Sequence, residues 1–136
     1  MGERVTVQIE HENLDPKLLL EKLIISNSGA IVSFTGLTRG HENGIKVHSL
    51  DFDAWEEQLP NVLRDLGNKS LTQFGVESVA IAHRVGSVGP GEPIVAIHVA
   101  SRHRKEAFQA CSWLIDSLKS QAPLWKKENR EDGTHW

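Results

Sequence analysis

Residues 94–118 read IVAIHVASRHRKEAFQACSWLIDSL, and this stretch decides the fold. Its first seven residues are almost all apolar, which is typical of a buried strand. From residue 104 onward the apolar side chains recur at helical spacing, so a long helix with one buried stripe is expected. The stripe consists of Ala107, Cys111, Leu114, Ile115 and Leu118. A buried strand followed by a one-sided helix indicates a sheet with helices packed on it.

The rest of the chain repeats this pattern of strands and helices. Further strands are expected at residues 5–9, 30–35, 45–55 and 79–84. Further helices are expected at residues 16–24, with Asp15 as N-cap, and at residues 56–74, disturbed at Pro60 and Gly67. The remaining segments are a loop at 36–44, a hairpin connection at 86–92 and an extended tail from Pro123. We therefore predict one α+β domain over residues 1–136, with its helices on one side of the sheet.

Composition narrows the class of protein. The chain has 136 residues, 39% of them hydrophobic, and a formal net charge of -3. It contains one cysteine and no run of about 18 apolar residues, and its first residues lack the basic-then-apolar order of a signal peptide. We expect a cytoplasmic protein without a disulfide and without membrane contact.

Positive charge is concentrated in the last third of this acidic chain. Residues 101–127 contain six lysines and arginines but only two acidic residues. A local cluster of cations on an acidic protein favours a site for a small anion, whereas proteins that bind nucleic acid non-specifically spread positive charge over a whole face. The six residues are Arg102, Arg104, Lys105, Lys119, Lys126 and Lys127.

The two ends of the long helix are too far apart for one small ligand. Arg104 and Lys119 lie about 22 Å apart along a helix that rises 1.5 Å per residue. Either the two ends serve different purposes, or a second copy of the chain brings its His103-Arg104 end beside Lys119, as a two-fold dimer does. Each cation can also be a plain surface charge, and Arg39 in the loop at 36–44 can be either a surface charge or an anion clamp.

Several familiar chemistries are absent from the sequence. It has no Gly-x-Ser-x-Gly elbow, no His-Glu-x-x-His and no phosphate-binding Gly-rich loop. The seven histidines do not pair at metal-ligand spacing, and His98 is interpreted as a hydrogen-bonded core residue. Cys111 lies on the apolar stripe, far from a helix N-terminus, and is interpreted as buried and inert. We expect no metal and no bound cofactor.

Six motifs spread over about 100 residues resemble one known family, the large, catalytic subunit of molybdopterin synthase. The motifs are Phe34-Thr-Gly-Leu-Thr-Arg39, Leu50-Asp-Phe-Asp-Ala-Trp55, His83-Arg84-Val-Gly86, Gly91-Glu92, Ser101-x-His103-Arg104-x-x-Ala107-Phe108 and Leu118-Lys119-x-x-Ala122-Pro123-x-Trp125-Lys126-Lys127-Glu128. The resemblance implies an α/β-hammerhead-like fold with an additional antiparallel β-sheet.

The resemblance also implies a reaction and its partners. Members of the family add two sulfurs to cyclic pyranopterin monophosphate (precursor Z), forming the dithiolene of molybdopterin during molybdenum cofactor biosynthesis. The sulfur comes from the C-terminal thiocarboxylate of a small ubiquitin-like sulfur-carrier subunit. Two large subunits form a central homodimer within a heterotetramer. On this basis the protein is expected to be a sulfurtransferase.

Site residues carried over by matching motif fall into two groups. Leu37, Thr38, Arg39, Lys119, Lys126, Lys127 and Glu128 are expected to line the pocket of one subunit. His103 and Arg104 are expected to come from the other subunit and, with Arg39, to hold phosphate and pterin polar groups. Lys119 and Lys126 are the expected catalytic residues, as acid, base or nucleophile, or by polarising the thiocarboxylate.

Two other classes of function fit parts of the pattern. A non-catalytic dimeric module that binds a phosphorylated metabolite or a partner's tail explains the cations, but not two lysines around an Ala-Pro-x-Trp corner. An RNA-binding protein fits less well, because the chain is acidic and has no tyrosine.

Overall fold

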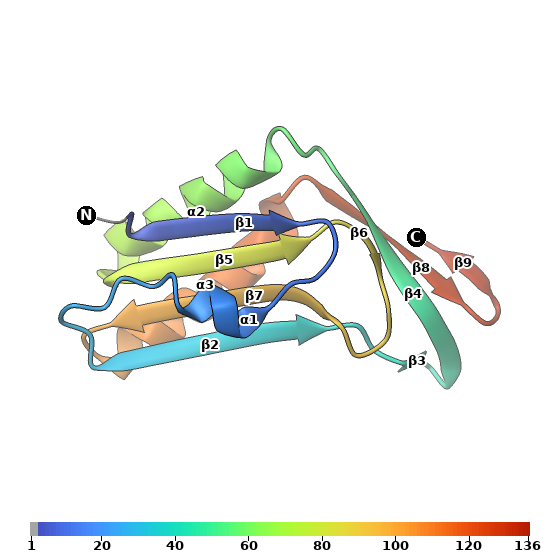
Figure 1. Ribbon diagram of the computed structural model, residues 1–136, viewed down its shortest axis with the longest axis horizontal. Helices are drawn as coiled ribbons and strands as arrows, with labels where there is room; N and C mark the ends of the chain where they lie inside the picture. Colours follow the sequence, from blue (N-terminus) through green and yellow to red (C-terminus); the bar gives the residue numbers. More distant parts are fainter. Residues whose placement is uncertain (1–2) are drawn as a thin grey trace.

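A four-stranded sheet forms the centre of the molecule in the computed structural model, which describes residues 3–136 (Figure 1). Its strands, in spatial order, are β1 (Val5–Glu10), β5 (Ser78–Arg84), β7 (Pro93–Ser101) and β2 (Ala30–Leu37). β1 runs parallel to β5, and the other neighbours are antiparallel. All seven residues of β5 are buried, because both faces of this sheet are covered.

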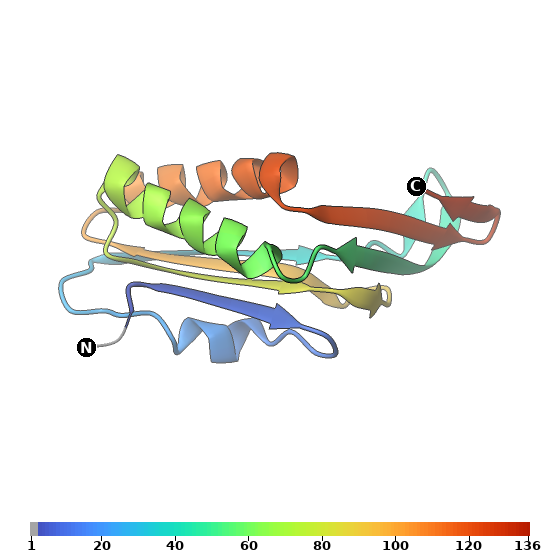
Figure 2. The ribbon, with the colours of Figure 1, turned by 90° about the horizontal axis from the view of Figure 1, so that it is seen from above.

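Helices cover both faces of the central sheet (Figure 2). α2 (Leu59–Phe74) and α3 (Arg104–Gln121) lie on one face, and the short α1 (Pro16–Leu20) lies on the other. The expectation that all helices share one side is therefore wrong. The physical reason is that alternate residues of β5 and β7 present small apolar side chains to the second face, and leucines from the α1 segment bury them. The alanines are Ala80, Ala82, Ala96 and Ala100, and the leucines are Leu14, Leu19 and Leu23.

α2 is one continuous helix, so the expected disturbance at Pro60 and Gly67 is also wrong. Pro60 lies in the first turn, where a missing N–H breaks no helical hydrogen bond. Gly67 faces β1 so closely that a Cβ atom there would lie 2.5 Å from Cγ1 of Val5. The glycine thus permits close packing of helix on strand. α1 begins as expected, with the Asp15 carboxylate accepting from the N–H of Lys17 at 2.9 Å, but it ends earlier than expected, at Leu20.

A second, antiparallel sheet extends beyond one end of the central sheet (Figures 1 and 2). It contains β3 (His41–Glu42), β4 (Ile45–Ala54), β8 (Leu124–Arg130) and β9 (Gly133–His135), and β6 (Gly86–Val88) also pairs with β4. The extended tail from Pro123 is confirmed as β8 and β9. The loop expected at 36–44 is only partly present, because β2 continues through Leu37 and β3 forms a hairpin whose turn residues Asn43 and Gly44 have positive φ.

The chain passes directly from α3 into β8, and this connection positions the site. Helix α3 ends at Gln121, and Ala122 already has extended backbone angles, φ -67 and ψ 133. The last turn of α3 therefore adjoins the first residues of β8. The α+β class and the additional antiparallel sheet predicted from the sequence are both present.

Candidate functional site

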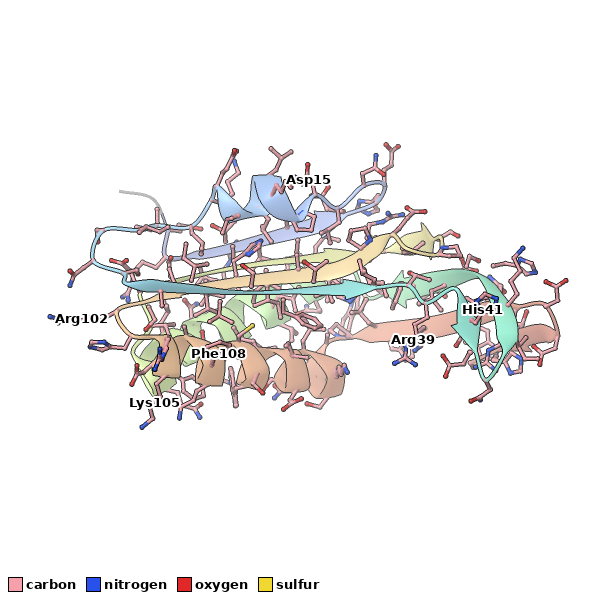
Figure 3. All side chains as sticks on the ribbon, turned by 90° about the horizontal axis from the view of Figure 1, so that it is seen from below. Asp15, Arg39, His41, Arg102, Lys105 and Phe108 are labelled. Carbon is pink, nitrogen blue, oxygen red and sulfur yellow. The ribbon has the colours of Figure 1, made fainter. Side chains whose placement is uncertain are left out.

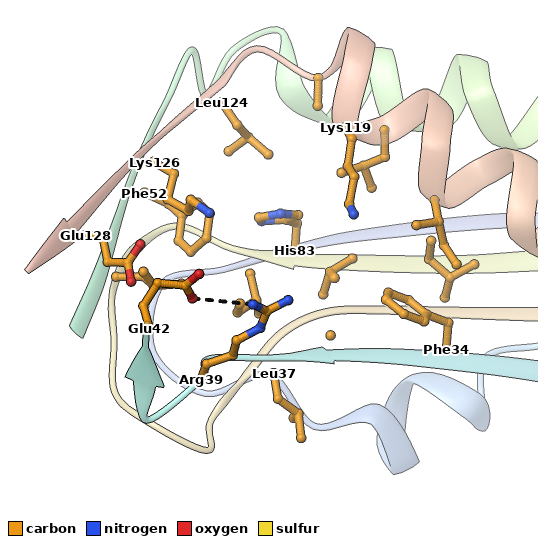
Figure 4. Close-up of a pocket in the computed structure, with 18 of the residues that line it drawn as sticks. Phe34, Leu37, Arg39, Glu42, Phe52, His83, Lys119, Leu124, Lys126 and Glu128 are labelled. Carbon is orange, nitrogen blue, oxygen red and sulfur yellow. Dashed lines mark hydrogen bonds and ion pairs between the residues drawn. The ribbon is translucent and has the colours of Figure 1, made fainter. Parts of the chain in front are cut away.

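A cavity of about 810 Å³ lies where the central sheet, the end of α3 and the second sheet meet (Figure 4). Its apolar lining comes from β2, β4, β7, α3 and β8 and includes Phe34, Leu37, Phe52, Ile97, Ile115 and Leu124. Its polar lining consists of Arg39, Glu42, His83, Lys119, Lys126, Glu128 and Arg130. A pocket that combines apolar walls with a few converging polar groups is typical of a small-molecule site.

Local structure explains why these polar side chains converge. Lys119 is in the last turn of α3, where a cation also interacts favourably with the helix dipole. Lys126, Glu128 and Arg130 are every second residue of β8, so they project from the same face of that strand. Arg39 follows the end of β2 and faces Glu42 of β3 (Figure 4).

The two acidic residues in the cavity are each engaged by an arginine. Nη1 of Arg39 lies 3.4 Å from Oε2 of Glu42. Nη2 of Arg130 donates to Oε2 of Glu128 at 3.3 Å, and this hydrogen bond raises the pKa of Arg130. Within residues 3–136, Lys119 and Lys126 have no ion-pair partner. The cavity therefore presents two free ammonium groups and an excess of positive charge, which suits an anion.

His83 on β5 lies in the centre of the polar lining, between Lys119 and Phe52 (Figure 4). Nδ1 of His83 lies 2.6 Å from the carbonyl oxygen of Arg84, and its ring packs edge-to-face on Phe52 with the ring centroids 5.3 Å apart. Burial lowers the pKa of His83 below the ordinary value of 6.5. The imidazole is therefore neutral at neutral pH.

Two residues expected in this pocket lie outside its lining. Thr38 is buried, and its backbone N–H donates to the carbonyl of Glu92 at 3.1 Å, so it anchors the end of β2. Lys127 projects from the other face of β8, where Nζ lies 3.6 Å from Oδ2 of Asp51 and 5.7 Å from the ring centroid of Trp136. Leu37, Arg39, Lys119, Lys126 and Glu128 do line the cavity.

His103 and Arg104 lie at the opposite end of α3 from Lys119. His103 is the N-cap of the helix, and both side chains are exposed to solvent. Figure 3 shows the neighbouring Arg102 and Lys105 at one end of the molecule, far from Arg39. Within one chain, the structure does not bring these two residues into the cavity.

Cys111 is buried and His98 is a hydrogen-bonded core residue, as the sequence predicted. Cys111 is 3% exposed, and burial raises the pKa of its thiol to about 11. Nδ1 of His98 accepts from the hydroxyl of Ser33 at 2.6 Å, and Nε2 donates to the carbonyl of Pro16 at 2.8 Å. Among residues 3–136 no three histidine, cysteine or acidic side chains are grouped as metal ligands. No helix in this part of the chain is long and apolar enough to cross a membrane.

Among the polar residues that line the cavity, sequence reasoning missed Glu42, His83 and Arg130, and it also missed the apolar lining around Phe52. A signal existed for Arg130, because an extended tail that places Lys126 on one face also places Glu128 and Arg130 there. His83 lies in one of the six motifs, but its place in the cavity depends on where the covering helices end, and no sequence pattern marks that point.

Three comparisons with known proteins agree. The model of the MoaE protein family matches residues 9–121. The chain is 34% identical over 127 residues to the molybdopterin synthase catalytic subunit of Thermoplasma volcanium, covering 93% of each chain. It is 38% identical over 109 residues to the protein of that name from Caulobacter vibrioides, covering 80% of this chain and 71% of the relative.

Solved structures show the same fold. The crystal structure of molybdopterin synthase from Staphylococcus aureus superimposes with a TM-score of 0.89 at 32% identity, covering 95% of this chain and 94% of the other. A complex of subunits 1 and 2 of the molybdopterin-converting factor from Helicobacter pylori contains a chain with a TM-score of 0.76 at 25% identity, covering 96% and 88%. The resemblance stated from the motifs is thus confirmed, and the chain belongs to the MoaE protein family.

Proposed function

We propose that this protein is the catalytic subunit of a molybdopterin synthase. It transfers sulfur from the C-terminal thiocarboxylate of a small ubiquitin-like partner to cyclic pyranopterin monophosphate, forming the dithiolene of molybdopterin. The observation that carries the proposal is the convergence of two unpaired lysines, Lys119 and Lys126, with Arg39 on one cavity. The names of its relatives in the family support the same activity.

The cavity suits both anions of this reaction. In each transfer the thiocarboxylate sulfur forms a bond to a substrate carbon, a carbon–oxygen bond of that carbon breaks, and the oxygen leaves as water or remains on the phosphate. Water then adds to the partner's acyl carbon, the bond from that carbon to sulfur breaks, and a carboxylate is left on the partner. Negative charge develops on the acyl oxygen as water adds, and a fixed ammonium group beside it stabilises that charge. We assign this role to Lys119 and Lys126, and phosphate binding to Arg39.

The proposed assembly places two chains around each site. His103 and Arg104 would reach the cavity of a second copy, in a central homodimer that carries one small subunit at each end. The Helicobacter pylori relative was solved as a complex of two subunits, which supports a small partner here. The proposal also includes a single domain over residues 1–136 and a cytoplasmic location.

The decisive experiment is conversion of precursor Z by the purified protein. We expect molybdopterin when the small subunit bears a thiocarboxylate and none when it bears a plain carboxylate. Lys119→Ala should fold and bind the partner, but lose turnover by about 100-fold or more. A folded protein that binds its partner and yields no product with either form would instead be a non-catalytic binding module.

A mixed dimer tests whether two chains share each site. A dimer of one Lys119→Ala chain and one Arg104→Ala chain contains one site with both defects and one intact site, if Arg104 acts across the interface. We expect about half of the wild-type turnover from this dimer, although each homodimer is inactive. If Arg104 acts within its own chain, both sites of the mixed dimer carry a defect and turnover is lost.

A further inference from the structure

Among residues 3–136, His83 is the only uncharged hydrogen-bonding side chain in the cavity lining. It is 4% exposed and is the second-to-last residue of β5, and the residues that line the cavity with it include the end of α3 and parts of the second sheet. The other polar lining residues are acidic or basic side chains: Arg39, Glu42, Lys119, Lys126, Glu128 and Arg130. A buried neutral group among so many charges does not serve as another anion anchor.

The hydrogen bond of Nδ1 defines the tautomer of His83. Nδ1 lies 2.6 Å from the carbonyl oxygen of Arg84, and a carbonyl oxygen can only accept, so Nδ1 carries the proton. In a neutral imidazole the other nitrogen, Nε2, then has a free lone pair. Nε2 has no hydrogen-bond partner within residues 3–136 and remains accessible from the cavity.

Several observations keep this imidazole neutral and fixed in orientation. Burial lowers the pKa of His83, which favours the neutral ring. The edge-to-face contact with Phe52 and the bond to Arg84 restrict rotation of the ring. A neutral ring nitrogen with a free lone pair and a fixed orientation can accept a hydrogen bond from a ligand.

We propose that His83 is a substrate-binding residue whose Nε2 accepts a hydrogen bond from an N–H group of the pterin ring. The proposal rests on the proposed function, which makes a pterin phosphate the ligand. A reduced pterin carries ring N–H groups and an exocyclic amino group, whereas its phosphate only accepts hydrogen bonds. The cations therefore bind the phosphate, and His83 orients the heterocycle.

His83 is better placed than the two carboxylates of the lining to accept a hydrogen bond from a ligand N–H. Among the described residues, Glu42 and Glu128 are the other side-chain acceptors in the lining, and each is already engaged by an arginine. A ligand N–H that met no acceptor would lose its hydrogen bond to water on entering the cavity. His83 removes that cost without bringing negative charge close to the phosphate or the thiocarboxylate.

Titration calorimetry with precursor Z tests this without the partner subunit. His83→Phe keeps a flat ring but removes the acceptor, so its Kd should rise about 10- to 100-fold. His83→Gln places an amide oxygen near the position of Nε2 and should stay within about threefold of wild type. Inorganic phosphate, titrated in the same way, should bind all three proteins equally. His98→Gln, at a buried histidine outside the cavity, is the matched control and should leave both affinities unchanged.

Each result has one meaning. Wild-type affinity for precursor Z in His83→Phe overturns the proposal, as does an equal loss in His83→Gln and His83→Phe when both fold. If His83→Gln binds normally but turns over as poorly as His83→Phe, the imidazole also moves a proton, and a role limited to substrate binding is overturned. Wild-type protein that binds precursor Z but makes no molybdopterin removes the proposed function and leaves the binding test of His83 intact.

Discussion

Replacing Gly67 by alanine should destabilise the protein through one contact. The new Cβ would lie 2.5 Å from Cγ1 and 3.3 Å from Cγ2 of Val5, which is 3% exposed and, being β-branched, has little rotamer freedom. Overpacking of this kind costs about 1–3 kcal/mol. The better helix propensity of alanine returns about 1 kcal/mol. The free energy of unfolding should therefore fall by up to about 2 kcal/mol.

A double-mutant cycle in urea isolates the contact. Val5→Ala removes both methyl groups that the new Cβ meets, so in that background Gly67→Ala should stabilise the protein by about 1 kcal/mol. The coupling between the two sites should then be about 1–3 kcal/mol. An equal loss from Gly67→Ala in both backgrounds would refute the idea that the approach of α2 to β1 requires this glycine.

Three further predictions concern charge and the thiol. Cys111→Ala should keep full turnover. In the wild-type protein burial raises the pKa of the Cys111 thiol from 9.0 to about 11, so iodoacetamide should alkylate this thiol about 100-fold more slowly than a free cysteine. Glu128→Gln should bind inorganic phosphate several-fold more tightly than wild type, because the substitution frees Arg130. Arg130→Met should bind phosphate several-fold more weakly. Equal affinities of the two variants for phosphate would contradict this. Burial lowers the pKa of His98 in the folded protein, so the unfolded chain binds the proton more tightly. The free energy of unfolding should therefore fall as the pH drops below about 6.5, and less so in His98→Gln. A urea midpoint that depends on pH as strongly in His98→Gln as in wild type would contradict this.

The sequence predicted the parts of the fold that depend on local pattern. The strand at 94–100, the long helix after it and the extended tail all follow from periodicity, and each is present. The side of the sheet on which a helix lies depends instead on tertiary packing. The alanines of β5 and β7 look like part of a continuous apolar run, and only the folded sheet shows that they face a second layer of leucines.

The residues of the candidate site also fall into those that the sequence predicted and those that only the folded structure shows. Arg39, Lys119 and Lys126 were found because they lie in motifs and in a local excess of charge. His83 also lies in a motif, but it was given no role because a histidine in an apolar strand resembles a core residue such as His98. The two differ in their surroundings, because His83 lines the cavity and His98 is hydrogen-bonded to Pro16. Thr38 shows the converse, since a motif residue can hold a loop in place without facing the cavity.

The length of α3 has a consequence for how this protein can change over evolution. The helix carries Arg104 at one end and Lys119 at the other, and an insertion of one residue between them rotates one end against the other by about 100°. If both ends serve active sites, in one chain and its copy, such an insertion misaligns two sites at once. Loops such as the one between β8 and β9 can vary in length. The number of residues from 104 to 119 sets the distance and the angle between the two ends of α3, so selection would keep that number constant.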